Sequence, residues 1–259
     1  MQTKKVADYI SNWLTQYTEK SNTKGYVVGI SGGIDSALTS TLCAKTGKEV
    51  CCILMPIHQN KNELNRSIAH VEWLQKQFPC VTYECIDLSE TFDVFARQLP
   101  QNISNQLTLA NTRARLRMTN LYAFASAKNM LVAGTGNKIE DFGVGFYTKY
   151  GDGGVDLSPI ADLSKSQVFK LSKHLNIVKE IQYAKPTDGL WEDGRSDEDQ
   201  LGATYNELEW AMKQYQVSNK NTFEYRQKEV FDIYKKHHTS NLHKMLPVPV
   251  CEIPENLVK

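Results

Sequence analysis

Residues 29–36 combine small, hydroxyl and acidic side chains in one short segment. They read Gly-Ile-Ser-Gly-Gly-Ile-Asp-Ser and directly follow the apolar run 26–28. Gly32 and Gly33 allow a turn with positive φ, in which the backbone can approach a ligand closely. The N–H groups of such a turn, with a helix N-terminus behind them, form a concave anion site. The segment therefore predicts a phosphate-binding loop between a strand and a helix.

Asp35 is unusual in a phosphate loop, because its charge repels the ligand. A Mg²⁺ ion between the carboxylate and the phosphate removes this conflict. The loop is not of the Walker type, because no Gly-Lys-Ser/Thr closes it. The alternative is a plain glycine turn in which Asp35 is only an acid in the first turn of a helix. The complete pattern favours a magnesium–nucleotide site.

A second polar segment, residues 134–141, follows the apolar run 130–133. Thr135 is placed to donate to phosphate or ribose. Glu140 or Asp141 can provide a second carboxylate for Mg²⁺, and the sequence leaves that choice open. Residues 145–156 then mix aromatic rings, one lysine, two aspartates and glycines. Aromatic rings can stack on a base or a pyridine ring, whereas the alternative is a surface loop with incidental tyrosines.

The elements that must position these groups alternate between helix and strand, which predicts an α/β fold with a doubly wound parallel sheet and helices on both faces. Ligands of such sheets bind beyond the carboxyl ends of the strands, where both polar segments fall. We expect one domain over residues 1–259. The pattern predicts strands at 26–30, 50–55, 81–86 and 130–133, and helices at 3–20, 34–45, 61–77, 89–97 and 105–128.

Composition narrows the class of protein. The chain has 259 residues, 41% of them hydrophobic, which is ample for one large core. Thirty basic residues face 29 acidic ones, and this balance argues against a nucleic-acid-binding protein. No apolar run approaches the roughly 20 residues of a membrane span, and the N-terminus shows no signal peptide. The six cysteines form no Cys-x-x-Cys motif. We expect reduced, mostly packed cysteines in a cytoplasmic protein.

Several segments, in order across almost the whole chain, resemble bacterial NAD synthetase, a family of the N-type ATP pyrophosphatases. The loop at residues 29–36 resembles the pyrophosphate loop of that superfamily. The more specific segments are Asn-Thr-Arg-Ala-Arg-Leu-Arg-Met at 111–118, the run 134–149 with the Tyr-Gly-Asp-Gly-Gly-Val-Asp that follows, Lys-Pro-Thr-Asp-Gly-Leu-Trp at 185–191, Ser-Asp-Glu-Asp-Gln-Leu-Gly at 196–202 and His243-Lys244. The resemblance implies an adenine nucleotide alpha hydrolase-like fold.

The resemblance also implies a role for individual residues. It makes Asp35 and Lys165 catalytic, and it places Asp35 and Glu140 on Mg²⁺. Some members carry one residue fewer before the Lys149 segment, so Asp141 is the alternative ligand. The ATP-binding residues it implies are Gly29, Ile30, Ser31, Gly32, Gly33, Ile34, Asp35, Ser36, Thr135, Lys165 and Thr187. Those for deamido-NAD are Arg115, Lys149, Asp156, His243 and Lys244.

The activity implied is a ligase reaction that forms a C–N bond. Deamido-NAD is amidated by ammonia with ATP as co-substrate, through an NAD-adenylate, to give NAD, AMP and pyrophosphate. Asp156 is a candidate for helping to deprotonate ammonium. With no glutaminase domain visible in the sequence, free ammonia or a separate donor protein is expected. The alternatives are a GMP synthetase core and a non-catalytic ATP-binding module.

Two of the expected helices carry residues that need a partner outside the helix. Lys165 lies in the first turn of an expected helix, where the dipole disfavours a cation unless an anion is near. The helix at 105–128 carries more apolar residues than one buried stripe needs. A two-fold partner would cover the surplus, so we expect a homodimer. Helices at 200–215 and 222–236 of the same chain are the alternative cover.

Overall fold

Four parallel strands form the centre of the computed structural model, which describes residues 1–186, 196–217 and 223–258. The strands are β1 (Gly25–Gly29), β2 (Glu49–Leu54), β3 (Val81–Cys85) and β4 (Leu131–Val132), in the order β3-β2-β1-β4. All three pairings are parallel. The predicted parallel sheet is confirmed, with β4 shorter than the expected 130–133 because only two of its residues join the ladder.

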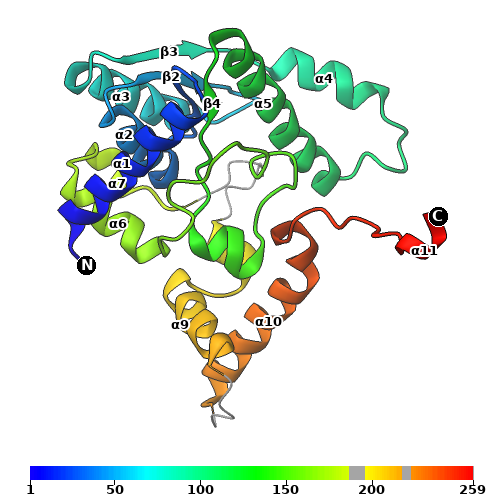
Figure 1. The fold of residues 1–259 in the computed structure, drawn as a ribbon. Coiled ribbons are helices and arrows are strands. Elements are labelled where there is room, and N and C mark those ends of the chain that lie inside the picture. The colour runs from blue at the N-terminus through cyan, green and yellow to red at the C-terminus, as the bar shows by residue number, and fades with distance from the viewer. Residues whose placement is uncertain (187–195, 218–222, 259) are drawn as a thin grey trace.

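Helices cover both faces of the sheet (Figure 1). On one face, Val28 and Cys52 pack in a core cluster with Leu14, Leu38 and Leu171, together with further side chains from α1 (Thr3–Lys20), α2 (Ile34–Ala44), α3 (Lys61–Gln77) and α6 (Lys165–His174). On the other face, the intervening strand residues pack against α5 (Gln106–Lys128). α4 (Ser89–Gln98) packs beside α5. The doubly wound architecture is therefore confirmed.

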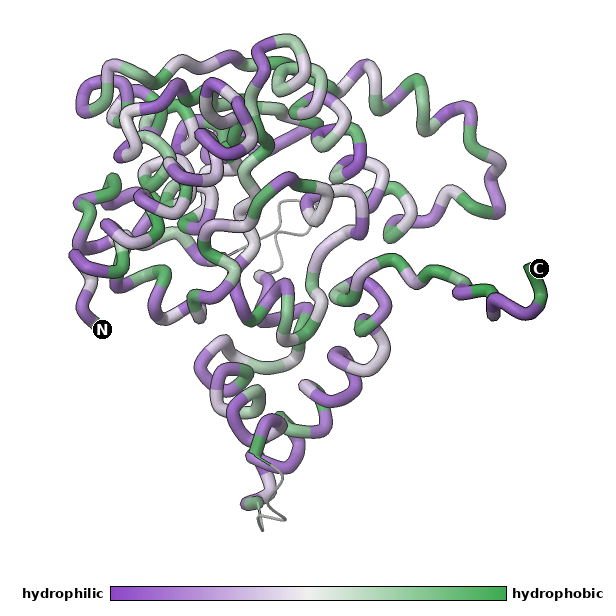
Figure 2. The backbone as a smooth tube through the Cα atoms, viewed as in Figure 1, coloured by the Kyte–Doolittle hydropathy of each residue, from purple (hydrophilic) through white to green (hydrophobic). Residues whose placement is uncertain are grey.

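A second body of helices lies below the sheet in the view of Figure 1. It consists of the π-helix η1 (Ile139–Val144), α8 (Asp197–Leu201), α9 (Tyr205–Gln216) and α10 (Tyr225–Met245). These elements share a small apolar core that includes Leu208 and Tyr234. Two further short helices are α7 (Lys179–Gln182) and α11 (Glu255–Val258). The segment beyond α10 is coloured as mainly hydrophobic in Figure 2, and its Val250 is exposed.

The predicted C-terminal helices are wrong in their bounds. A single helix over 200–215 is not formed, because Gly202 adopts φ +76° and ends α8. Thr204 then caps α9 by accepting a hydrogen bond from the Glu207 N–H. The helix expected at 222–236 continues to Met245. His243 and Lys244 consequently lie in its last turn.

Within the described residues, α9 and α10 make their main contacts with each other and with η1, and α9 also packs on α6. The main contacts of α5 are with β1, β4 and α4. The alternative in which the C-terminal helices cover the surplus apolar surface of α5 is thus not supported. In the same part of the chain, no helix is both long and apolar enough to cross a membrane. All six cysteines are free. Cys43, Cys51 and Cys52 are buried as expected, whereas Cys85 and Cys251 are exposed.

Candidate active site

The two predicted polar segments meet in one cavity of about 250 Å³. Residues 29–31 and 33–36, at and after the end of β1, line it together with residues 133–136, which follow β4, and Lys165. The two strands are neighbours in the sheet, so their carboxyl ends open at the same edge. The prediction that both segments lie at the carboxyl ends of the strands is confirmed. Thr187 lies outside the described residues.

Hydrogen bonds between Ser31 and Ser36 connect the two ends of the phosphate loop. The Ser36 hydroxyl accepts from the Ser31 N–H at 3.3 Å and lies 3.1 Å from the Ser31 hydroxyl. Gly32 adopts φ +83°, and a Cβ there would lie 2.7 Å from the carbonyl oxygen of Glu63 on α3. Only glycine therefore fits between the loop and α3. Helix α2 begins behind the loop without a side-chain cap, so its first N–H groups remain available to an anion.

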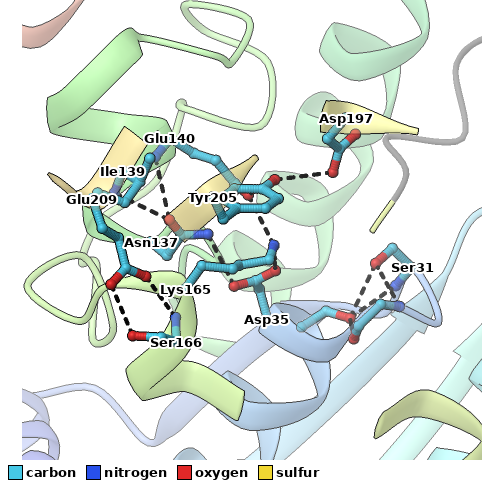
Figure 3. A network of polar contacts seen from close by, with 12 residues as sticks. Ser31, Asp35, Asn137, Ile139, Glu140, Lys165, Ser166, Asp197, Tyr205 and Glu209 are labelled. Atoms are coloured by element: carbon cyan, nitrogen blue, oxygen red, sulfur yellow. Dashed lines mark hydrogen bonds and ion pairs between the residues drawn. The ribbon is translucent and has the colours of Figure 1, made fainter. Parts of the chain in front are cut away.

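Lys165 joins the two predicted metal ligands. Its Nζ lies 2.6 Å from Asp35 Oδ2 and 2.9 Å from Glu140 Oε1 (Figure 3). Its side chain is 4% exposed. Three elements far apart in sequence, α2, η1 and α6, thus converge on one ammonium group. The expectation of an anionic partner for this first-turn lysine is confirmed.

Asn137 and Glu209 fix the backbone around this triad. The Asn137 side-chain amide donates to Asp35 Oδ1 at 3.1 Å, while its oxygen accepts from the Glu140 N–H at 3.2 Å. Asn137 itself is fully buried. At the start of α6, the Glu209 carboxylate accepts from the Ser166 N–H and hydroxyl, both at 2.8 Å. The carboxylates and the lysine are therefore held by packed, hydrogen-bonded backbone (Figure 3).

One ammonium group faces two carboxylates in this buried cluster. Burial and the charge of Glu140, opposed by Lys165, raise the pKa of Asp35 above its ordinary value. Burial also opposes ionisation of Glu140, but the Lys165 charge and hydrogen bonds from Tyr205 and Lys165 hold its pKa below the ordinary value. Burial likewise opposes the Lys165 charge, yet the two carboxylates keep its pKa raised. The cluster carries an excess of acid that a further cation would balance.

The donor set fits Mg²⁺ bound to a nucleotide. Asp35 and Glu140 already share one cation, so their oxygens converge on a common point. Carboxylates are suitable ligands, and Mg²⁺ is commonly bound by one or two of them together with substrate phosphates. In the described residues no group of three or more His, Cys, Asp or Glu side chains forms a metal site. The phosphates of ATP would complete the coordination.

Asp141 lines the same cavity as the triad but forms no ion pair with Lys165. Its carboxylate packs against Gly136, where an added Cβ would come within 2.1 Å of Asp141 Oδ1. Burial, reinforced by the charges of Glu140, Asp152 and Asp35, raises the pKa of Asp141 well above its ordinary value. The geometry favours Glu140 as the metal ligand, because Asp141 does not contact Lys165.

The alanine variants at these two positions should separate their roles. Glu140→Ala is expected to raise the Mg²⁺ concentration needed for half-maximal activity by about 10- to 100-fold, a typical cost of disturbing a metal site. Asp141→Ala should change that concentration little. Mg²⁺ titrations of the two purified variants measure the difference. Equal Mg²⁺ requirements in both variants would refute the assignment of Glu140.

The rest of the cavity wall contains groups that sequence reasoning missed. Met118, Leu121 and Phe146 give it an apolar side, and Arg117 adds a cation. Arg117 also donates through Nε to the carbonyl oxygen of Met55 at 3.0 Å. Asp152 also lines the cavity, and desolvation of its carboxylate by the surrounding protein raises its pKa to about 6. The sequence marked the segment 145–156 but not Phe146 or Asp152 within it, because the side chains that face the cavity depend on contacts between separate segments.

The five residues expected to contact deamido-NAD do not line the cavity in the described structure. Lys149 Nζ donates to the carbonyl oxygen of His243 at 2.8 Å, and the Lys149 carbonyl accepts from Arg115. Lys244 donates to the carbonyl oxygens of Gly145 and Tyr147. These contacts connect the end of α10 to residues 145–149 and to α5. Binding of deamido-NAD by these residues stays a prediction.

Asp156 also lies outside the cavity lining. Its carboxylate accepts from the Val132 N–H at 2.8 Å and from the Tyr122 hydroxyl at 3.0 Å. These bonds secure the edge of β4. As a candidate to receive a proton from ammonium, Asp156 is therefore placed less well than Asp152, which does line the cavity.

Comparison with known proteins gives consistent matches over most of the chain. The family model described as NAD synthase matches residues 6–247. An NH3-dependent NAD(+) synthetase of Mycoplasmopsis pulmonis is 40% identical over 212 residues, covering 82% of this chain and 79% of the relative. An NMN synthetase structure from Francisella tularensis has a TM-score of 0.87 at 30% identity and covers 98% and 100% of the two chains. An NH3-dependent NAD synthetase structure from Campylobacter jejuni has a TM-score of 0.80 at 28% identity, with 97% and 100% covered.

Proposed function

The chain belongs to the NAD synthase family, and we propose that it catalyses the amidation of deamido-NAD by ammonia with the consumption of ATP. The products are NAD, AMP and pyrophosphate, so the enzyme is a ligase that forms a C–N bond. The observation that carries the proposal is the Asp35–Lys165–Glu140 cluster beside the phosphate loop. A buried lysine between two carboxylates at a phosphate site suits an enzyme that cleaves ATP next to a bound metal ion.

The first step joins two anions. The nicotinate carboxylate of deamido-NAD attacks the α-phosphorus of ATP, the bond between the α-phosphorus and the bridging oxygen breaks, and pyrophosphate leaves. The product is an NAD-adenylate. Activation is needed because a free carboxylate resists attack by ammonia. No side chain need act as nucleophile, so the chain contributes by holding both anions in line and reducing their repulsion.

Different residues would bind the phosphates, the metal ion and the pyridine ring. The N–H groups of the phosphate loop and of the first turn of α2 would bind the phosphate oxygens. Asp35 and Glu140 would hold Mg²⁺, which supplies Lewis-acid stabilisation of charge on the phosphates when bound. Lys165 would turn from the carboxylates toward the phosphates. Met118, Leu121 and Phe146 form the apolar part of the wall, where the pyridine ring can pack.

In the second step ammonia attacks the acyl carbon of the adenylate, and AMP leaves. Ammonium must first lose a proton. Asp152 is the proposed acceptor, because it lines the cavity and its pKa of about 6 lies near the working pH, as general-base catalysis requires. The ionised form dominates above pH 6 and disappears below it. The rate with ammonium should therefore fall as the pH drops through about 6.

Asp152→Asn is expected to lower kcat/KM for ammonium about 100- to 10,000-fold near neutral pH. Raising the pH should restore part of this loss, because more NH3 is then free without a protein base. The measurement is the pH profile of NAD formation for both proteins. A variant with the wild-type rate and the wild-type profile at neutral pH would exclude Asp152 as the base.

The overall function is tested with one coupled assay. Purified protein with ATP, Mg²⁺ and deamido-NAD should release pyrophosphate and form NAD when ammonium is supplied. Glutamine should give almost no product, since the curated relative in Mycoplasmopsis pulmonis is named for NH3 as donor. Xanthosine monophosphate in place of deamido-NAD tests the GMP synthetase alternative. Binding of ATP without any turnover would instead support the non-catalytic alternative.

A second candidate substrate is nicotinate mononucleotide. The similar structure from Francisella tularensis is described as an NMN synthetase, and NMN is the amide of that mononucleotide. The chemistry at the carboxylate would be the same, and only the AMP half of the dinucleotide would be missing. Comparing kcat/KM for deamido-NAD and for nicotinate mononucleotide decides between the two substrates. A higher value for the mononucleotide would reassign the product to NMN.

We also propose that the enzyme is a cytoplasmic homodimer. Leu107 at the start of α5 is 61% exposed, and the C-terminal helices make their main contacts elsewhere. A second copy of the chain would cover this face. Six free cysteines are consistent with a reducing compartment. Light scattering at assay concentration tests the dimer, and a fully active monomer would contradict it.

A further inference from the structure

Tyr205 occupies the point where the site meets the second body of helices. It is the first residue of α9 and is 5% exposed. Its hydroxyl donates to Glu140 Oε1 at 2.6 Å and lies 3.2 Å from Asp197 Oδ2 (Figure 3). One tyrosine thus contacts carboxylates from two separate elements.

The ring of the same residue contacts the third charged group. Lys165 Nζ lies 4.6 Å from the centre of the Tyr205 ring, a cation–π distance that stabilises an ammonium group. Lys165 and the tyrosine hydroxyl share one oxygen, Glu140 Oε1. If Lys165 turned to a phosphate, the hydroxyl would still hold the Glu140 carboxylate in place.

Hydrogen bonds at the start of α9 fix the position of Tyr205. The Tyr205 N–H donates to Glu198 Oε1 at 2.8 Å, and Thr204 and Glu207 form a reciprocal capping box at the start of the helix. Arg226 of α10 donates to Glu207 at 2.8 Å. The ring is therefore placed by a capped helix with an ion pair to its neighbour.

From these contacts we propose that Tyr205 is a positioning residue, which orients Glu140 for the metal–nucleotide without touching the substrate. The proposal rests on the metal role of Glu140 given above. Residues that hydrogen-bond to a metal-coordinating side chain typically change metal affinity or activity about 10- to 100-fold when they are replaced. The loss of the Tyr205 hydroxyl should consequently appear first in the Mg²⁺ dependence of nucleotide binding.

The test is calorimetric binding of α,β-methylene ATP, which cannot be cleaved at the α–β position, at a series of Mg²⁺ concentrations. Tyr205→Phe keeps the ring and its contact with Lys165 but removes the hydroxyl. The Mg²⁺ concentration at half-saturation should rise about 10- to 100-fold. Tyr26→Phe is the matched control. Tyr26 is equally buried, and its hydroxyl bonds to Thr18 of α1, so this variant should bind as wild type.

Two further measurements separate a positioning role from a structural one. Saturating Mg²⁺ should return the turnover of Tyr205→Phe to within a few-fold of wild type, whereas a misfolded site would not recover. Glu140→Gln tests the metal role separately. If Glu140→Gln shifts the Mg²⁺ dependence strongly but Tyr205→Phe behaves like Tyr26→Phe, the positioning role of Tyr205 is refuted and the metal role of Glu140 stands. If Glu140→Gln also binds as wild type, the metal role of Glu140 fails with it.

Discussion

Lys165→Met should destabilise the metal-free protein by about 3–5 kcal/mol and remove almost all activity. The substitution keeps most of the unbranched side chain but leaves Asp35 and Glu140 buried without their shared counter-ion. Breaking a buried ion pair from one side typically has a cost of this size, because an uncompensated charge remains. Urea unfolding in the absence of divalent ions measures the loss of stability.

Lys138→Met provides the control for Lys165→Met. Lys138 forms an ion pair with Asp162 at a similar distance, 2.8 Å, but at the surface, with Asp162 97% exposed. The control should lose at most about 1 kcal/mol. Added Mg²⁺ should return part of the lost stability to Lys165→Met, because the divalent ion takes over the carboxylates. A Lys165→Met protein as stable as the control would show that Lys165 does not compensate these charges.

Asp35→Asn is expected to lower turnover about 100- to 1,000-fold and leave the fold intact. The reason for the lost activity is that Mg²⁺ loses an anionic ligand beside the scissile phosphate, and such electrostatic contributions amount to several kcal/mol of the barrier. Stability should be maintained, because Lys165 and Glu140 remain as a balanced pair. Coupled NAD formation and thermal unfolding measure the two quantities on the same samples.

Asp162→Asn controls for the loss of one carboxylate, since Asp162 is exposed and lies outside the cavity lining. It should keep wild-type turnover. Near wild-type turnover of Asp35→Asn at limiting Mg²⁺ would contradict the metal assignment. A large fall in its melting temperature would instead indicate that Asp35 is needed for folding.

The sequence predicted those parts of the site whose pattern lies within a short segment of the chain. The phosphate loop needs a glycine with positive φ at Gly32 and hydroxyls five residues apart, so its pattern is contained in eight residues. The strands were readable because β1 and β2 are buried on both faces and therefore nearly continuous in apolar residues. The carboxyl-edge position of the site followed from the parallel topology.

The parts that it did not predict depend on distant contacts. Tyr205 reaches Glu140 across 65 positions, and its Thr-Tyr-Asn surroundings look like an ordinary helix start. Asp152 lies in a glycine-rich segment, and only the folded structure shows that it lines the cavity. The helix bounds near Gly202 failed because one residue with positive φ divides an otherwise helical pattern. A closer reading of the Thr204–Glu207 capping box would have located the start of α9.

The three arginines of α5 show what residue spacing alone can predict about the directions of side chains on a helix. Arg113, Arg115 and Arg117 are two residues apart, so on a helix they point to different sides. Arg113 lies over the Phe92 ring, Arg115 contacts the Lys149 carbonyl, and Arg117 lines the cavity. The geometry of the helix was thus predictable, but the choice of Arg117 as the inward residue was not. That choice depends on where α5 packs against the sheet.

The lysine that bridges Asp35 and Glu140 also matters for inhibitor discovery. In a screen without Mg²⁺, compounds would meet an ammonium group between the two carboxylates. In a screen with Mg²⁺ and nucleotide, they would meet a divalent ion there and a lysine turned toward the phosphates. Amine fragments selected under the first condition would compete with Lys165 itself and lose affinity under the second. Chelating fragments would show the opposite preference, so the two screens would return different chemical series for one cavity.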